Sequence, residues 1–227
     1  LGGGVVPDAF MILSRIISSF HNDKGELLIK GLTPTEQDVF ELSDEFVKSS
    51  LSSTGVNLFE MDSYSKRLWL EPALSILAID APPVAESVNL LIPKAKAKVS
   101  LRLPPTEDPD HAMNMLEQHI KENTPFNANV EFIPEAKGKG ILVDPKNEFS
   151  SKLIESFNKY WENEVAYMGV GGSIPFANVF INEFPNSEIV LVGAGDEEGN
   201  AHAPNESVNI SDIQRLIDSL TDALSNY

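Results

Sequence analysis

The stretch of sequence that decides the fold is KAKAKVSLRL, residues 94–103, in which polar and apolar side chains alternate at every position. A period of two residues is that of a β-strand with one covered face and one solvated face. The polar face carries a row of lysines, a common way to protect a sheet edge or a solvated face. The stretch therefore predicts a strand of an antiparallel sheet that packs on a core with one face.

The segments around this strand predict helices and further strands. Apolar residues at helical spacing predict helices over residues 5–20 and 110–121, with a short helix around residues 36–50. Residues 73–79 and 129–133 have the composition of strands. Roughly the first 135 residues therefore predict an α+β sandwich, an antiparallel sheet with helices on one face.

The pattern changes after residues 137–140, KGKG. Helices are expected over residues 149–160, after residue 175, and from Ser211 with Gln214 completing a capping box. The continuous apolar run IVLV, residues 189–192, is typical of a buried strand. So few strands cannot close a core, and the segment is interpreted as half of a larger α/β domain.

Composition excludes several classes of function. The net charge is −17, with 34 acidic against 17 basic residues, which argues against nucleic acid and anionic membrane surfaces as partners. The chain has no cysteine, so disulfides, thiolate catalysis and cysteine-based zinc sites are excluded. It also lacks a signal-peptide pattern, and a cytoplasmic location is expected. The start at Leu1, without a methionine, is interpreted as a cut end.

Of the four histidines, His202 is the candidate metal ligand. It follows the buried-strand run, where α/β proteins place their ligand sites. His111 and His119 lie about 12 Å apart along one predicted helix, so they cannot share a metal and are expected at the surface. His21 follows a helix end and is interpreted as structural. A zinc site needs three or four ligands, which His202 alone does not supply.

Two further features could bind a substrate carboxylate. Gly171, Gly172 and Ser173 open a helix, where free backbone N–H groups suit an anion, although the same residues also make an ordinary capped turn. Arg102, on the polar face of its strand, is either a solvated edge charge or a guanidinium fork that clamps a carboxylate.

Together these stretches resemble the dizinc peptidase and deacylase family of aminoacylase, carboxypeptidase G and the carnosinase-like cytosolic dipeptidases. The matching pieces occur in the order of the family: GGGVVPDA (residues 2–9), SVNLLIP (87–93), KVSLRLPP (98–105), GGSIP (171–175) and HAPNE (202–206).

The resemblance implies that residues 1–138 form a lid or dimerisation domain without its first strand. Residues 139–227 would be the C-terminal part of an α/β zinc-peptidase catalytic domain. It implies hydrolysis of dipeptides or N-acyl amino acids by water activated between two zinc ions, in a homodimer that pairs through the lids.

The resemblance also assigns site residues. His202 would bind metal, and Arg102 would hold the substrate carboxylate together with the backbone at Gly171, Gly172 and Ser173. Asn89 would reach into the partner subunit's site. The other ligands, the general base and an oxyanion histidine are absent, so no catalytic residue is expected in this chain. The chain alone is expected to be inactive, with zinc absent or incompletely bound.

Two alternatives remain open. Gly169 and Val170 replace a polar pair that usually precedes GGSIP, which favours a non-catalytic dimerisation module of a degenerate family member. The other alternative is an unrelated α/β binding protein.

Overall fold

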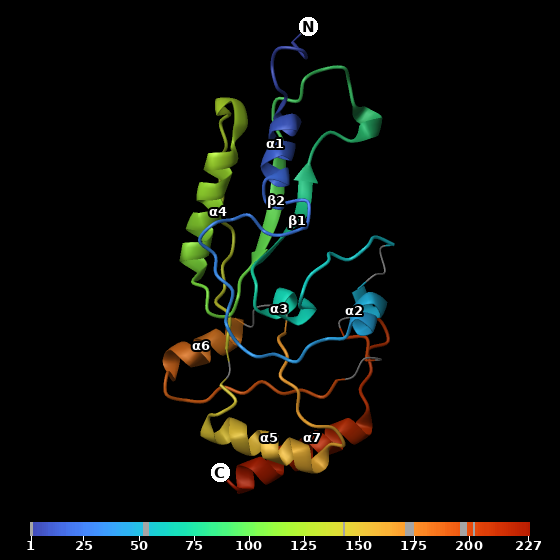
Figure 1. Cartoon of the computed structure of the whole chain (residues 1–227), viewed down its shortest axis with the longest axis vertical. Coiled ribbons are helices and arrows are strands. Elements are labelled where there is room, and N and C mark those ends of the chain that lie inside the picture. Colours follow the sequence, from blue (N-terminus) through green and yellow to red (C-terminus); the bar gives the residue numbers. More distant parts are fainter. Residues whose placement is uncertain (1, 52–54, 143, 171–174, 196–198, 202) are drawn as a thin grey trace. The chain divides into compact units, whose positions relative to one another are not determined.

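The computed structural model describes the whole chain except residues 1, 52–54, 143, 171–174, 196–198 and 202 (Figure 1). The chain divides into two compact units. Unit 1 comprises Leu1–Gly140 and Met168–Ser173, and unit 2 comprises Ile141–Tyr167 and Ile174–Tyr227. None of the described helices is both long and apolar enough to cross a membrane.

Unit 1 is built around a β-hairpin. Its elements are α1 (Ala9–Ser18), α2 (Asp44–Leu51), α3 (Tyr64–Trp69), β1 (Ala73–Asp80), β2 (Lys96–Arg102) and α4 (Pro109–Asn123), with short 3-10 turns at Val84–Glu86 and Pro125–Asn127. The strands β1 and β2 are antiparallel, with Ala73 opposite Arg102 and Asp80 opposite Lys96. The predicted antiparallel sheet with helices is confirmed, and its deciding strand occupies Lys96–Arg102.

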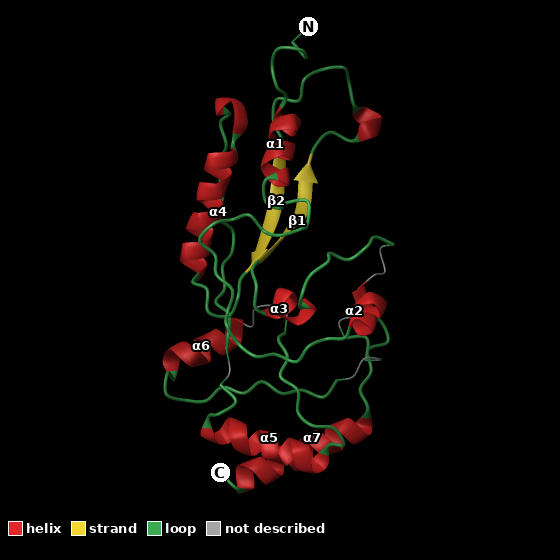
Figure 2. Ribbon diagram, in the orientation of Figure 1, coloured by secondary structure: helices red, strands yellow, loops and turns green. Residues whose placement is uncertain are grey.

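The core of unit 1 lies between the apolar face of the hairpin and the helices α1 and α4 (Figure 2). Its buried members are Ile16, Phe20, Ile29, Leu74 and Leu116. Val99 and Leu101 of β2 pack against them, whereas Lys96, Lys98 and Arg102 are exposed on the other face. The alternation of β2 in the sequence therefore separates core from solvent, as its period of two requires.

The predictions of strands over residues 129–133 and 189–192 are wrong for this chain. Among the described residues, only β1 and β2 pair as a sheet. A strand needs the backbone of a neighbour to satisfy its N–H and C=O groups, and no described segment supplies one here. Phe132 still packs against the core of unit 1, so this segment keeps the inward-facing residue of its pattern.

Unit 2 contains α5 (Glu148–Tyr160), α6 (Pro175–Glu183) and α7 (Ile210–Ser225), which confirms the three predicted helices. The N-cap of α7 is Asn209, so the predicted capping box at Ser211 is wrong. The helices α5 and α7 pack together, and Asp222 of α7 accepts hydrogen bonds from Lys159 (2.8 Å) and Ser156 (2.9 Å) of α5. These two donors hold the pKa of Asp222 below its ordinary value.

His119 was expected at the surface, and that expectation is wrong. His119 exposes only 8% of its area. Its ring stacks on the ring of Phe20, with the two centroids 5.4 Å apart. The Nε2 atom lies 3.0 Å from the Ser19 hydroxyl and 3.1 Å from the Ser19 carbonyl oxygen. Burial lowers the pKa of His119, although the Ser19 carbonyl and the nearby Glu122 act in the opposite direction.

We expect His119 to make unit 1 less stable below about pH 6.5, the ordinary histidine value. The unfolded chain takes up a proton at that value, whereas the folded unit with its lowered pKa stays neutral to lower pH. The contribution is complete above this pH and is lost progressively as the pH falls from this value through the lower pKa of the folded state. His119→Gln should reduce the difference between urea unfolding at about pH 7.5 and about pH 5.5. His111→Gln, at a half-exposed ring, is the control, and an unchanged difference in His119→Gln would contradict the assignment.

Candidate functional site

Arg102 ends β2 with its guanidinium exposed. No described residue forms an ion pair or hydrogen bond with it. Other cations of the same face have acids nearby, since Lys98 pairs with Glu135 at 2.5 Å and Lys96 lies opposite Asp80. The guanidinium therefore keeps its five donors available for a carboxylate ligand.

The segment that leads into the glycine-rich loop lies near the same end of the hairpin. Ala73, the cross-strand partner of Arg102, follows the end of α3 at Trp69 by four residues. A Cβ atom added to Gly169 would lie only 2.4 Å from Cγ and 2.5 Å from Cβ of Trp69. The indole thus occupies the space that a larger residue at position 169 would need. This contact is a structural reason for the glycine at a position where the family usually has a polar residue.

Asn89 lies at the opposite end of the hairpin from Arg102. It is exposed in the connection between β1 and β2, whereas Arg102 is the last residue of β2. The seven residues of β2 extend for about 20 Å, so the two side chains cannot contact one small ligand from the same subunit. The structure brings Arg102 close to the end of α3 and leaves Asn89 apart.

Gly171, Gly172, Ser173 and His202 lie outside the described residues, but the backbone on both sides of position 202 is described. The Ser207 N–H donates to the Gly199 carbonyl (2.9 Å), and the Ala203 N–H donates to the Asn200 carbonyl (2.9 Å). Asn200 and Asn205 have φ values of 50° and 64°, in the left-handed region that asparagine tolerates better than most residues. These bonds join described residues on both sides of position 202, in the loop that leads into α7.

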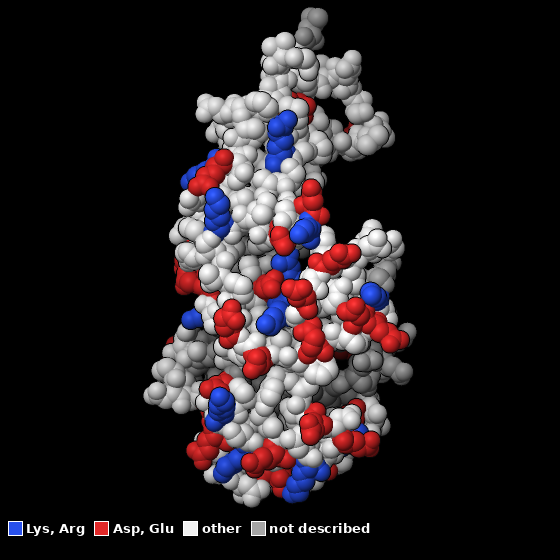
Figure 3. Space-filling view, in the orientation of Figure 1, with Lys and Arg blue, Asp and Glu red and all other residues white. Residues whose placement is uncertain are grey.

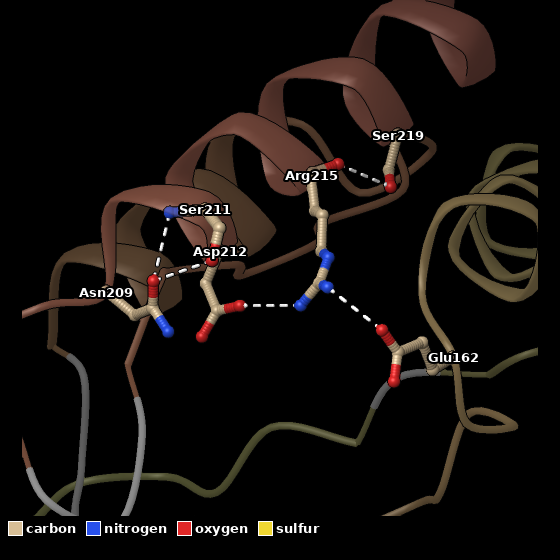
Figure 4. A network of polar contacts seen from close by, with 6 residues as sticks. All are labelled: Glu162, Asn209, Ser211, Asp212, Arg215 and Ser219. Atoms are coloured by element: carbon tan, nitrogen blue, oxygen red, sulfur yellow. Dashed lines mark hydrogen bonds and ion pairs between the residues drawn. The ribbon is translucent and has the colours of Figure 1, made fainter.

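A polar network fixes the point where this loop joins α7 (Figure 4). The Asn209 Oδ1 atom accepts from the Ser211 N–H (3.0 Å) and hydroxyl (2.6 Å). Arg215 donates to Asp212 (3.1 Å) and to Glu162 (3.2 Å), which follows α5. The sequence reading missed this network, although the spacing of Asp212 and Arg215 on a predicted helix is a recognisable ion-pair signal.

Arg215 also holds an aromatic contact. Its guanidinium carbon lies 5.7 Å from the ring centroid of Trp161, within the range of a cation–π interaction. One arginine therefore ties the first turns of α7 to the segment after α5.

The residues that the structure describes do not complete a metal centre. Within the described part of the chain, no three His, Asp or Glu side chains come together as possible ligands. His202 would add a single imidazole, whereas a zinc centre needs three or four ligands.

Comparison with known proteins places the chain in a family. Residues 2–128 match the peptidase dimerisation domain of the M20 peptidases, and the chain belongs to this family. It is 28% identical, over 99% of its length, to the cysteinylglycine-S-conjugate dipeptidase of Corynebacterium striatum. It is 25% identical, over 93% of its length, to the Cys-Gly metallodipeptidase DUG1 of Saccharomyces cerevisiae. The chain spans about half of these relatives, 50% and 47% of their lengths.

Solved structures share the fold. Human carnosine dipeptidase 1 superposes with a TM-score of 0.74 at 18% identity, over 99% of this chain and 51% of that protein. The M20 metallo-carboxypeptidase Sso-CP2 of Sulfolobus solfataricus gives 0.71 at 22% identity, over 98% and 53%. At these identities the likeness establishes the fold alone.

Proposed function

We propose that this chain is part of a longer metal-dependent hydrolase that cleaves the amide bond of dipeptides or N-acyl amino acids. Residues 1–138 form its lid or dimerisation domain, without the first strand, and residues 139–227 form the C-terminal part of its catalytic domain. The observation that carries the proposal is the likeness to a dipeptidase over 99% of the chain, across about half of that enzyme.

The chain contributes binding groups to the proposed enzyme and leaves the catalytic groups to the rest of the protein. His202 supplies one ligand of a dizinc centre, and the remaining ligands and the general base lie outside these 227 residues. Arg102 and the backbone at Gly171, Gly172 and Ser173 hold the free carboxylate of the substrate. A positioned arginine fork supplies orientation as well as charge.

Asn89 belongs to the site of the second subunit in this proposal. Its separation from Arg102 by the length of the hairpin supports the assignment. Two residues so far apart on one lid can contact the same substrate only if each comes from a different subunit of a homodimer. A cytoplasmic location is part of the same proposal.

Metal analysis and hydrolysis of a dipeptide and N-acyl amino acid panel by the purified longer protein test this function. We expect bound zinc, hydrolysis that a chelator abolishes, and no hydrolysis by the 227-residue chain alone. The rival is a non-catalytic dimerisation module, which the contact between Trp69 and Gly169 favours because it excludes the usual polar residue. A longer protein that dimerises without binding metal or hydrolysing any member of the panel would establish the rival.

Arg102→Ala in the longer protein should lower kcat/KM about 100-fold, mainly through KM. The reason is the loss of charge-assisted bonds to the substrate carboxylate. Arg102→Lys should recover only part of the loss, because an ammonium lacks the planar fork. Lys98→Ala, on the same face of β2, is the matched control and should change kcat/KM less than about threefold. Equal effects of Arg102→Ala and Lys98→Ala would exclude a carboxylate clamp.

A further inference from the structure

Two exposed apolar side chains flank Gly169, directly before the glycine-rich loop. Met168 exposes 59% of its area and Val170 exposes 85%. Both residues belong to unit 1, together with Gly169 and Trp69. Single exposed apolar residues are ordinary on a protein surface. These two differ because they come immediately before Gly171, which the proposed function places at the substrate carboxylate.

The indole of Trp69 sets how this segment is presented. A Cβ atom added to Gly169 would lie only 2.4 Å from Cγ of Trp69, so the backbone of Gly169 rests against the indole. Leu70, the residue after Trp69, is 4% exposed and anchors that end of α3. Successive side chains of an extended segment point to opposite sides. Since Gly169 turns toward the indole, Met168 and Val170 are directed away from it, in agreement with their exposure.

This segment offers no partner to an ionic side chain of a substrate. Residues 165–175 contain no charged side chain, so a lysine or arginine of a substrate meets no carboxylate there. A substrate with a second carboxylate meets a chain of net charge −17, and acidic side chains prevail on the face that Figure 3 shows. Burying an ion without a partner is costly, whereas an apolar side chain gains free energy by covering other apolar groups. The segment therefore favours an apolar substrate side chain.

We propose that Met168 and Val170 make the site selective for substrates whose carboxyl-terminal residue has an apolar side chain, such as leucine or phenylalanine. This inference rests on the proposed function, in which the backbone from Gly171 onward holds the substrate carboxylate. The carboxyl-terminal side chain and that carboxylate are attached to the same carbon atom. Val170 therefore lies beside the side chain when Gly171 holds the carboxylate, and the contact of Gly169 with Trp69 keeps both apolar side chains turned outward.

Hydrolysis of Gly-Leu, Gly-Lys and Gly-Asp, and of the three matching N-acetyl amino acids, by the longer protein measures this selectivity. We expect kcat/KM for the leucine compound to exceed that for the other two at least about 10-fold, as for contacts in a hydrophobic pocket. Val170→Lys supplies a cation to a second substrate carboxylate, so the preference for leucine over aspartate should fall at least about 10-fold. Met168→Lys should change it in the same direction. Val56→Lys, at a position 66% exposed between α2 and α3, is the control and should leave the preference within about twofold.

The proposal is overturned if Val170→Lys, Met168→Lys and Val56→Lys change the preference by the same factor while their urea midpoints equal that of the unsubstituted protein. It is also overturned if the unsubstituted protein prefers the lysine or the aspartate compound. If the longer protein hydrolyses none of the compounds, the proposed function fails, and calorimetric titration with the same compounds decides this inference. Tighter binding of Gly-Leu that Val170→Lys weakens supports it, and equal binding of all three dipeptides contradicts it.

Discussion

His202→Ala in the longer protein should lower kcat/KM for its dipeptide substrate by about 10³-fold or more and reduce the bound metal. The expectation follows from the proposed role of His202 as one of the three or four ligands on which each metal depends. Loss even of a group that only supports a ligand costs roughly 10- to 100-fold in metal affinity or activity, so loss of the ligand should exceed that. Steady-state kinetics and metal stoichiometry of the same preparation measure both effects.

The control for this substitution is another histidine of the chain. His111 pairs with Glu107 at 2.7 Å in unit 1 and has no proposed part in the site. His111→Ala should therefore leave kcat/KM and metal content within about twofold. A His202→Ala protein with unaltered metal content and kinetics would remove His202 from the ligand set, while the likeness to the dipeptidases would remain.

The part of the fold that could be predicted is the part with a local signal. The alternation of β2 is contained in 7 consecutive residues, and the apolar stripes of α1, α4, α5 and α7 are contained in helices of 10 to 16 residues. Strand pairing has no such signal, because it depends on a neighbour distant in sequence. Residues 129–133 and 189–192 carry strand composition, yet no described segment pairs with them.

The burial of His119 could have been predicted from the sequence. Ala112, Leu116 and His119 recur at helical spacing, and all three are buried. The surface position was expected because His111 and His119 lie too far apart along the helix to share a metal, and this distance says nothing about burial. The helical stripe that places Leu116 in the core also includes His119, where Ser19 satisfies its ring nitrogen.

The candidate site could be predicted only where a resemblance supplied the pairing of distant residues. Arg102 has an exposed side chain for a local reason, its place on the polar face of β2. The contact between Trp69 and Gly169 joins residues a hundred positions apart, and no periodicity relates them. The sequence shows only that position 169 is a glycine. The structure gives the reason, because the indole of Trp69 occupies the space that a side chain at position 169 would need.

Phe20→Ala should destabilise unit 1 by about 3 to 5 kcal/mol, the usual loss for a phenylalanine in a packed core. Phe20 is 2% exposed and belongs to the core cluster that joins α1, α4 and the hairpin. Its ring also stacks on His119, so the substitution leaves a cavity beside a buried polar ring. Because an isolated two-stranded hairpin is marginal, loss of this contact should affect the whole unit.

The two tryptophans allow unit 1 to be followed alone, since Trp69 lies in unit 1 and Trp161 in unit 2. In a Trp161→Phe background, the fluorescence of Trp69 during urea unfolding should show a midpoint lower by more than about 1 M for Phe20→Ala. Phe10→Ala, at a half-exposed position of α1, is the matched control and should cost no more than about 1 kcal/mol. Equal midpoints for the two variants would show that Phe20 does not hold α1 and α4 on the hairpin.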